Sequence, residues 1–411
     1  LPVMAGFRFA TCPRLVCEQG GSAQLGSLAS ELGLRHAFVV TDRFLHDQGL
    51  LGPALTSLEQ AGIRVTLYHD VQADPPEGVV QDAVARATSA GIDGVIGFGG
   101  GSSLDTAKLV ALLARSPQDI ASIYGVDLAR GPRWPLIQVP TTAGTGSEVT
   151  PIAIVTTGET TKMGVVAPQL YADHVLLDAA LTSGLPPLQT AATGIDAMVH
   201  AIEAYTSRHR KNPLSDLFAR EGLRLLAHNL VVACTDGGNR AAREAMLLGA
   251  CYAGMAFANS PVAAVHALAY PLGGHFHLPH GLTNALMLDP VLAFNLPAAA
   301  GLYGELAGVL PALPGEKPDD PAQVFLARLR DLIARSGAPR RLRDVGVRAE
   351  ALPMLARDAM KQTRLLDNNP VPVTEAVEVM RTSPAPLAVA MTPLTAPVTV
   401  AFWLTVMSPS T

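Results

Sequence analysis

Apolar and polar positions along the first half of the chain follow two alternating patterns. Short, mostly apolar runs of five or six residues, typical of buried strands, alternate with longer stretches in which apolar residues recur at helical spacing. The strand-like runs are 36–41, 64–68, 94–98 and 135–139, and the helical patterns are 24–32, 54–61 and 78–89. The alternation predicts a parallel sheet with helices on both faces, an architecture that binds ligands at the carboxyl ends of its strands.

The pattern changes near Pro187, after which strand-like runs nearly vanish. Helical periodicity continues over residues 191–205, 213–226, 239–255 and 321–335. We therefore expect an α/β domain over residues 1–187 and an all-helical domain over residues 188–382. The last segment, 383–411, contains five prolines, which oppose a continuous helix, and we treat it as a separate C-terminal tail.

The composition fits a packed enzyme of 411 residues, since 49% of them are apolar, 16% are charged and the net charge is -5. Such a mild charge, with no basic stripe, gives no reason to expect nucleic acid or an anionic membrane as a partner. The apolar run 398–407 is shorter than the ~20 residues that span a bilayer. The four cysteines form no CxxC pair and the N-terminus lacks the features of a signal peptide, so we expect free thiols and a cytoplasmic protein.

A run of three glycines, Gly99-Gly100-Gly101, directly follows the strand-like run 94–98 and precedes a helical pattern that begins near Ser102. Glycines let backbone N–H groups approach an anion closely, and the N-terminus of the helix directs its positive end to the same place. This arrangement suits the pyrophosphate of a dinucleotide, although the G-x-G-x-x-G fingerprint is absent. A plain strand–helix turn that needs glycine is the alternative interpretation.

Polar residues at the ends of two other strand-like runs suit the rest of a dinucleotide. The loop 140–150 carries four threonines, a serine and two glycines, which can hold the phosphate and ribose of a cofactor. Asp42 closes the run 36–41, where a carboxylate accepts hydrogen bonds from an adenosine ribose and repels a 2′-phosphate. A solvated surface loop and an ordinary strand-end aspartate are the alternatives.

Histidines and a carboxylate gather in two segments of the helical half. Asp196 and His200 are four residues apart in a helical pattern, so their side chains share one face. The fifteen residues from His266 to His280 contain four of the eleven histidines, in an otherwise apolar and glycine-rich sequence. Because imidazole and carboxylate groups are ligands of divalent metals, the two segments together predict a metal site. For Asp196 and His200 taken alone, the alternative is that the two residues share an exposed helical face by coincidence.

Four motifs of this chain resemble those of the iron-containing alcohol dehydrogenase family. They are GGGS-x-x-D-x-A-K at 99–108, PTTAGTGSEVT at 140–150, TG-x-DA-x-x-HAIE-x-Y at 193–205, and HALA-x-x-LG followed by PHG at 266–281. The resemblance extends over residues 7–379. It implies an N-terminal NAD-binding domain, a C-terminal helical metal-binding domain and a cleft between them, in the fold shared with dehydroquinate synthase.

The resemblance also implies which residues bind the metal and the cofactor. By similarity the metal ligands are Asp196, His200, His266 and His280. By similarity the residues at the cofactor are Gly99, Gly100, Gly101, Ser102, Asp105, Thr141, Thr142, Thr145 and Lys162, with Asp42 where the family separates NAD from NADP. Three imidazoles and a carboxylate do not fix the metal, because Zn2+ would bind them tightly, whereas the resemblance implies Fe2+.

The implied reaction is the transfer of a hydride between a small alcohol, or its aldehyde or ketone, and NAD. The divalent ion polarises the alcohol oxygen as a Lewis acid, and the hydride passes from the carbinol carbon to nicotinamide C4. We expect a homodimer whose partner is a small-molecule substrate.

Three alternatives remain: another enzyme of the same family, a related lyase, and a non-catalytic binding or scaffold protein, against which the complete set of metal-ligand candidates argues. A maleylacetate reductase typically lacks the full ligand set, all of which is present here, and a hydroxyacid–oxoacid transhydrogenase is a further member of the same family. A lyase related to dehydroquinate synthase would need basic residues in the cleft, and the segment 260–285 has no lysine or arginine.

Two features depart from the family pattern. Relatives often have a second histidine, which helps to carry the substrate proton, where this chain has Tyr270. A phenol with a pKa of about 10 is a poor base at neutral pH, whereas the ordinary pKa of an imidazole is about 6.5. We therefore expect His277 rather than Tyr270 to pass the proton to solvent, the alternative being that His277 only packs against the cleft wall. The tail 383–411 has no counterpart in the family.

Overall fold

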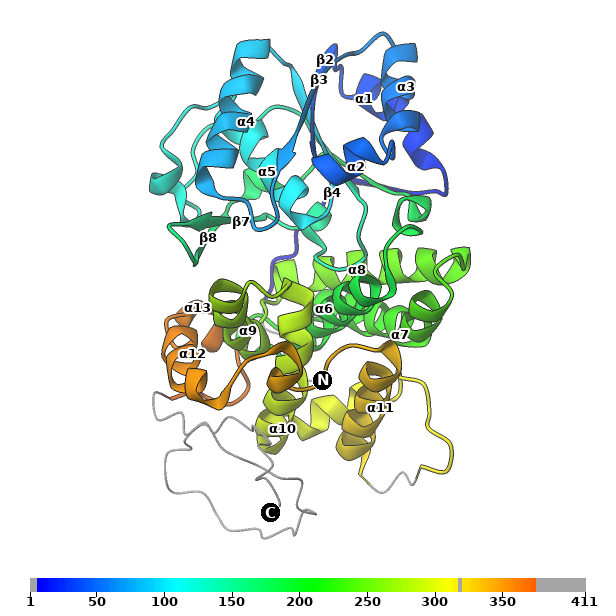
Figure 1. Cartoon of the computed structure of the whole chain (residues 1–411), viewed down its shortest axis with the longest axis vertical. Helices are drawn as coiled ribbons and strands as arrows, with labels where there is room; N and C mark the ends of the chain where they lie inside the picture. The colour runs from blue at the N-terminus through cyan, green and yellow to red at the C-terminus, as the bar shows by residue number, and fades with distance from the viewer. Residues whose placement is uncertain (1–5, 317–319, 375–411) are drawn as a thin grey trace.

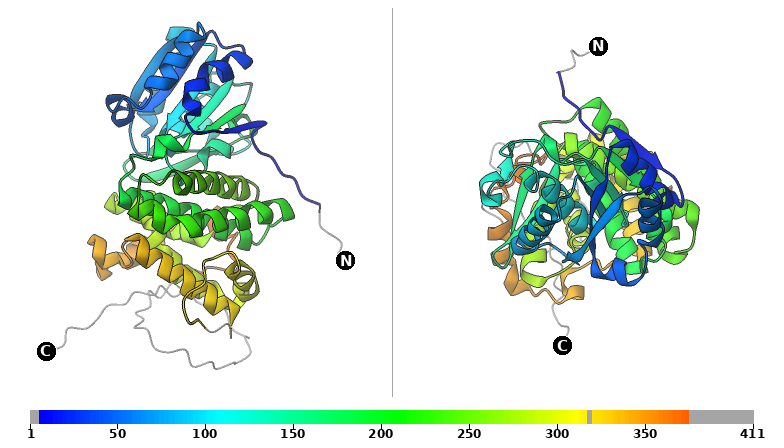
Figure 2. Two further views of the ribbon diagram at one scale, coloured as in Figure 1. Left: turned by 90° about the vertical axis from the view of Figure 1, so that its right-hand side faces the viewer. Right: turned by 90° about the horizontal axis from the view of Figure 1, so that it is seen from above.

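The computed structural model describes residues 6–316 and 320–374, which form an α/β part and a helical part stacked along the long axis (Figure 1). The α/β part runs from strand β1 (Arg14–Cys17) to the 3-10 helix η5 (Ala179–Thr182), and the helical part from α6 (Pro187–Thr206) to α13 (Thr363–Leu366). Figure 2 shows the same stacking from the side. The tail expected over 383–411 lies outside the described residues.

A six-stranded parallel sheet forms the centre of the α/β part, in the order β1-β9-β6-β4-β2-β3. The four strand-like runs of the sequence are confirmed as β2 (His36–Asp42), β3 (Arg64–Val71), β4 (Gly94–Gly99) and β6 (Leu136–Pro140). The strands β1 and β9 (His174–Leu177) are additions that the apolar pattern did not predict.

Helices cover both faces of this sheet, as the sequence pattern predicts. Along β2, Val39 packs with α1 (Leu25–Glu31) and α3 (Gly52–Gln60), whereas its neighbours Phe38 and Val40 pack with α4 (Glu77–Ala90) and α5 (Gly101–Leu113). Burial on both faces explains why the strands read as continuous apolar runs rather than as an alternation. The short helices of this part are η1 (Gly21–Gln24), α2 (Arg43–Asp47), η2 (Ile120–Ile123), η3 (Ser147–Val149) and η4 (Pro168–Leu170).

A second, three-stranded sheet lies at the lower edge of the α/β part, next to the helical part (Figure 1). Strand β8 (Thr161–Val166) pairs in parallel with β5 (Gly125–Val126) and antiparallel with β7 (Ile152–Thr157). The sequence pattern predicted no strand here. The hairpin matters for the site, because it brings side chains of β7 and β8 to the junction of the two parts.

Helices alone make up the described helical part. The patterns expected there are confirmed within α6, α7 (Pro213–Thr235), α8 (Arg240–Asn259) and α11 (Pro321–Ser336). α6 packs against both α7 and α8 and also against α10, so it lies at the centre of the bundle. The remaining helices are α9 (Ala264–Phe276), α10 (His280–Ala307), η6 (Leu342–Val345), η7 (Ala349–Ala351) and α12 (Leu352–Ala359).

α10 continues through Pro290 and Pro297, which is why the sequence pattern did not show it as a helix. Within the described part of the chain it is the one helix that is long and apolar enough by length and composition to cross a membrane, and the bent pair α8 and α9 passes the same test together. Buried helices of a protein core have the same properties, and α10 packs along α6, α9 and α11.

Candidate active site

A cavity of about 560 Å3 lies where the α/β part meets the helical part. One wall comes from the start of α5, the loop after β6, and the hairpin β7–β8. The opposite wall comes from α6, the end of α8, α9, the start of α10, and α13. The cavity therefore lies at the carboxyl ends of the central strands, where open parallel sheets bind ligands.

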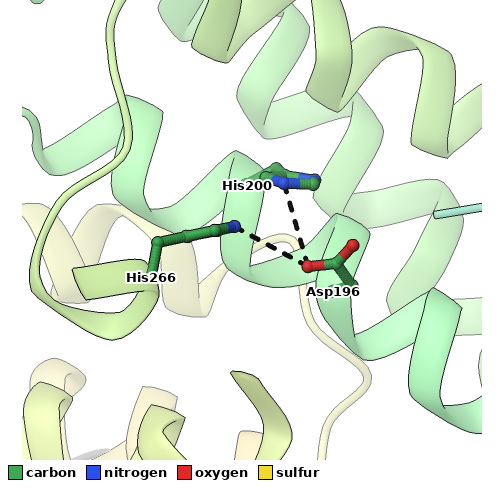
Figure 3. Close-up of side chains that lie close together, drawn as sticks. All are labelled: Asp196, His200 and His266. Carbon is green, nitrogen blue, oxygen red and sulfur yellow. Dashed lines mark ion pairs between the residues drawn. The ribbon is translucent and has the colours of Figure 1, made fainter. Parts of the chain in front are cut away.

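Three buried side chains of the helical wall point toward one another (Figure 3). Asp196 and His200 lie one turn apart on α6, and His266 comes from the first turn of α9. The Nε2 atoms of His200 and His266 lie 3.8 and 3.7 Å from Oδ1 of Asp196. The helical spacing seen in the sequence thus places the carboxylate and the first imidazole on one face, and the fold adds the second imidazole.

His280, the first residue of α10, adds a third imidazole, and its Nε2 atom is also 3.7 Å from Oδ1 of Asp196. We call Asp196, His200, His266 and His280 the Asp196 cluster. Ligand atoms about 2.1 Å from one ion are separated by about 3.4 Å in a tetrahedral arrangement. The ligand atoms of Asp196, His200 and His266 all lie within 4.8 Å of one another, and His280 adds a further imidazole beside Asp196, so the donor set fits one first-row divalent ion.

The amide of Asn284, one turn along α10 from His280, reaches the middle of the Asp196 cluster. Its Nδ2 atom lies 2.5 Å from Oδ1 of Asp196, 3.1 Å from Nε2 of His266 and 3.3 Å from Nε2 of His280. Its Oδ1 atom is buried without a hydrogen-bond partner. Acceptor atoms of three residues thus converge on one point, as the ligands of a cation must.

Glu203 holds His266 from behind and was not identified from the sequence. One carboxylate oxygen accepts a hydrogen bond from the backbone N–H of Val265 at 2.6 Å. The other lies 2.7 Å from Nδ1 of His266 and accepts from the N–H of Ala263 at 2.9 Å. The carboxylate therefore keeps the proton of the imidazole on Nδ1 and leaves the Nε2 lone pair directed at Asp196. Its spacing of seven residues from Asp196, on the same helical face, is the signal that could have revealed it.

The protonation states of the Asp196 cluster suit a metal. Burial lowers the pKa of His200 to about 3, and burial also lowers the pKa of His280. Burial alone would raise the pKa of Asp196, but the three neighbouring histidines hold that pKa below its ordinary value. The lowered pKa values favour neutral imidazoles at His200 and His280 and an ionised carboxyl group at Asp196, which is the state that ligands must adopt to bind a divalent ion.

Apolar side chains surround the cluster on the helical wall. The ring of Phe257, at the end of α8, stacks on His200 with a centroid separation of 4.3 Å. Val262, Leu278 and Leu365 line the same region. They exclude water from part of the cavity, which strengthens electrostatic interactions inside it. These positions carried no signal in the sequence, because apolar residues are common throughout the chain.

The opposite wall brings together part of the residues expected at the cofactor: Gly101, Ser102, Thr145 and Lys162 line the cavity. α5 begins at Gly101, so its N-terminus opens onto the cavity. A Cβ atom on Gly101 would lie 2.9 Å from a methyl carbon of Thr145, so only glycine lets the two loops approach this closely. Nζ of Lys162 donates a 2.8 Å hydrogen bond to Thr156 and lies 3.0 Å from the carboxylate of Asp74.

Asp105 also lines the cavity, but most of its contacts are internal. Its carboxylate accepts hydrogen bonds from Ser147 at 2.5 Å and from the N–H of Ile154 at 2.9 Å, and it lies 3.5 Å from Nζ of the buried Lys108. Burial raises the pKa of Asp105 and lowers that of Lys108, while the two charges oppose these shifts. The pair fastens α5 to the loop and the hairpin that complete the wall.

Several of the expected residues do not line the cavity. Asp42 ends β2, and its carboxylate caps α2 by accepting a 2.9 Å hydrogen bond from the N–H of Leu45. Gly99 and Gly100 lie in the turn before α5, where Gly99 has a φ of 156°. The residues that the structure leaves outside the cavity lining are Asp42, Gly99, Gly100, Thr141, Thr142 and His277.

The two candidates for proton transfer are in different environments. Tyr270 lines the cavity, its ring centroid is 5.7 Å from that of His280, and burial raises the pKa of its phenol to about 12. His277 is exposed and ends α9 with a φ of 53°, in the left-handed region. The helix stops there, so the imidazole is not carried into the cavity, and this geometry does not support the expectation for His277.

Comparisons with known proteins find one family over most of the chain. The family model for iron-containing alcohol dehydrogenase matches residues 12–179, and the model for the C-terminal region of that family matches residues 190–382. Long-chain-alcohol dehydrogenase 1 of Geobacillus thermodenitrificans is 40% identical over 364 residues, which cover 87% of this chain and 91% of that protein.

Two solved structures show the same likeness. A structure of 1,3-propanediol oxidoreductase superposes with a TM-score of 0.86 at 33% identity, and covers 90% of this chain and 97% of its own. The sulfoacetaldehyde reductase of Bifidobacterium kashiwanohense in complex with NAD+ superposes with a TM-score of 0.81 at 28% identity, and covers 90% of this chain and 96% of its own.

Proposed function

Because the chain belongs to the iron-containing alcohol dehydrogenase family, and is therefore a metal-dependent, NAD-linked oxidoreductase, we propose that the Asp196 cluster binds its catalytic divalent ion. The observation that carries this proposal is the convergence of three imidazole Nε2 atoms on Oδ1 of Asp196. Iron is the metal implied by the family, and a small alcohol or its aldehyde is the substrate.

When bound, the ion acts as a Lewis acid on the substrate oxygen and NAD accepts the hydride. The protein supplies position and environment. Gly101 and Ser102 present backbone N–H groups and the N-terminus of α5 to the pyrophosphate of the cofactor. Lys162 and Thr145 line the same wall and would contact the bound cofactor there. The apolar wall beside Phe257 keeps water from the carbinol carbon.

We place the substrate proton on a path beside Tyr270 rather than at His277. Because its pKa is raised to about 12, the phenol stays protonated at neutral pH and can donate a hydrogen bond to an aldehyde oxygen. Its position near His280 supports this role.

The experiment that tests the metal assignment is a His266→Ala substitution followed by elemental analysis and an assay of alcohol-dependent NAD reduction. We expect about one divalent ion per chain in the unmodified protein, by the logic of a four-ligand site. The variant should lose both the metal and the activity. A variant that keeps both would overturn the assignment.

Cofactor choice depends on Asp42 in this proposal. Its carboxylate ends β2 and caps α2 through one oxygen, which leaves the second oxygen for an adenosine ribose. NAD should be used with a higher kcat/KM than NADP, and an Asp42→Gly variant should narrow the difference. Equal use of the two cofactors by the unmodified enzyme would count against this role.

We also propose that the protein is a cytoplasmic homodimer. The four cysteines are free in the structure, and three of them are buried, which suits a reducing compartment. Light scattering of the purified protein should give the mass of two chains, and the mass of one chain would contradict the proposal.

The domain boundaries 1–187, 188–382 and 383–411 are also part of the proposed function. The start of α6 at Pro187 supports the first of these boundaries.

A further inference from the structure

Some of the charged groups that line the cavity have a partner of opposite charge, and others do not. Each lining carboxylate lies near a cationic group or a histidine: Asp74 with Lys162, Asp105 with Lys108, Asp367 with His209, and Asp196 with its three histidines. Two guanidinium groups of the lining, Arg210 and Arg364, have no carboxylate partner within residues 6–316 and 320–374. The positive charges of Arg210 and Arg364 are therefore the ones in the lining that no carboxylate of the described residues contacts.

Both arginines belong to the wall that carries the Asp196 cluster. Arg364 is on α13, which packs against α9, the helix of His266 and Tyr270. Its charge acts on the phenol of Tyr270, where it opposes the rise in pKa that burial causes. Arg210 follows the end of α6, the helix that supplies Asp196 and His200.

Hydrogen bonds join the two segments that carry these arginines into one rim. The N–H of Arg208 donates to the carbonyl of Asn368 at 2.9 Å, and His209 lies 3.2 Å from the carboxylate of Asp367. The buried amide of Asn368 donates to the carbonyls of Arg364 and Val262 at 3.1 Å. The rim is thus fastened to the apolar wall beside the Asp196 cluster.

We propose that Arg210 and Arg364 form an anion subsite, and that the enzyme acts on alcohols and aldehydes whose far end carries a carboxylate or sulfonate group. The proposal rests on the proposed function, because the reacting oxygen of such a substrate binds at the Asp196 cluster. A guanidinium group matches the planar geometry of a carboxylate and binds it through two hydrogen bonds. A substrate held at both ends is oriented for hydride transfer.

The phosphates of NAD are the other anions that enter the cavity. In the proposed function they bind at the opposite wall, at Gly101, Ser102 and the N-terminus of α5. The arginines and the phosphate site belong to different parts of the fold. Kinetic constants for the substrate and for the cofactor therefore separate the two assignments.

The test compares 4-oxobutanoate with butanal, its uncharged analogue, as substrates for the metal-loaded enzyme and NADH. The unmodified enzyme should have the higher kcat/KM for 4-oxobutanoate. Arg210→Gln and Arg364→Gln should each lower that value about fivefold, which is the size of an exposed ion pair, and should do so mainly through KM. The kcat/KM for butanal should not change in Arg210→Gln. In Arg364→Gln the lost charge also acts on Tyr270, so the readout for that variant is the ratio of the kcat/KM values for the two aldehydes. The preference should also shrink as the salt concentration rises, since salt screens exposed charges.

Arg208→Gln is the matched control, because Arg208 is exposed and close in sequence to Arg210 but does not line the cavity. Equal values for the two aldehydes in the unmodified enzyme would overturn the anion subsite and leave the dehydrogenase activity intact. A rise in KM for NADH, with an unchanged preference between aldehydes, would assign the arginines to the cofactor instead.

A binding measurement keeps the subsite testable without turnover. In a calorimetric titration of the holoenzyme with NAD present, 4-hydroxybutanoate should bind more tightly than 1-butanol, and the double variant Arg210→Gln, Arg364→Gln should lose the difference. Equal affinity for the two compounds would contradict the subsite. If the unmodified enzyme reduces neither aldehyde but still binds 4-hydroxybutanoate more tightly than 1-butanol, the proposed reaction fails and the anion subsite stands.

Discussion

Glu203 makes contacts with one side chain and two backbone N–H groups while almost fully buried, and all of them converge on the start of α9. A glutamine at this position keeps one oxygen acceptor but replaces the other with an amide NH2 group, which cannot accept from a backbone N–H. A Glu203→Gln variant should therefore turn the imidazole of His266 and weaken metal binding by about 10–100-fold, as is typical when the partner of a liganding histidine is lost.

Competition with a chelator measures that affinity without reference to turnover. Glu244→Gln on α8 is a suitable control, because this glutamate is exposed. Unchanged metal affinity in the Glu203→Gln variant, together with an unchanged pH profile of metal binding, would show that Glu203 only supports the fold.

The proton path is a second question at the scale of single residues. Tyr270→Phe should lower kcat for aldehyde reduction by roughly 100-fold, as expected for the loss of a positioned proton donor, while metal content stays the same. His277→Ala should leave kcat nearly unchanged, because that imidazole lies outside the cavity lining. The reverse result would restore His277 as the proton carrier.

The choice between these two residues stays a prediction, and it depends on structure that residue chemistry alone does not determine. The ordinary pKa values of phenol and imidazole favoured His277, but they carry no information about where α9 ends. The positive φ of His277 turns the chain out of the helix, and this depends on contacts beyond the local sequence. Asp196 and His200 were predictable because helical spacing fixes their relative position.

Among the structural elements, the loop from β6 to β7 has a pH-dependent stability of its own. Glu148 of η3 is only 2% exposed, and burial raises its pKa from 4.5 to about 7, an effect that nearby Lys108 only partly offsets. A carboxyl group with a raised pKa in the folded state stabilises the fold fully below its unfolded value and loses that contribution as the pH rises through the folded value.

The melting temperature should therefore fall as the pH rises from 4.5 to about 7, and Glu148→Gln should flatten this dependence. At pH 8, above this range, the free energy of unfolding of Glu148→Gln should exceed that of the unmodified protein by roughly 1–3 kcal/mol, since one pKa unit corresponds to about 1.4 kcal/mol. Thermal melts of both proteins across this pH range provide the measurement. Parallel curves for the two proteins would mean that Glu148 does not titrate in the folded state.

The elements that the sequence predicted share a strong periodic signal. β2, β4 and β6 are buried along nearly their whole length, so their sequences are mostly apolar and do not alternate with polar residues. The hairpin β7–β8 is only half-buried and alternates weakly, and its pairing depends on contact with the rest of the α/β part. α10 is a helix despite two internal prolines because packing against three neighbouring helices outweighs their local cost.

For the whole molecule, the site exists because the two parts of the fold meet. The change from alternating to purely helical periodicity anticipated those parts, and the histidine-rich segment anticipated the metal chemistry. The resemblance implied a cleft between the domains, but the sequence could not reveal which residues line it, the contact of the Asn284 amide with Asp196, or the pairing of charges around the rim. These features join residues that are far apart in the sequence.

The most direct test of the account is a titration of metal-free protein with Fe2+ under anaerobic conditions, with alcohol-dependent reduction of NAD as the readout. We predict that activity is absent at the start, rises in proportion to bound metal, and saturates near about one ion per chain. The same titration of His266→Ala should show no rise. Full alcohol-dependent reduction of NAD by the metal-free protein would contradict the assignment of the Asp196 cluster as the catalytic metal centre.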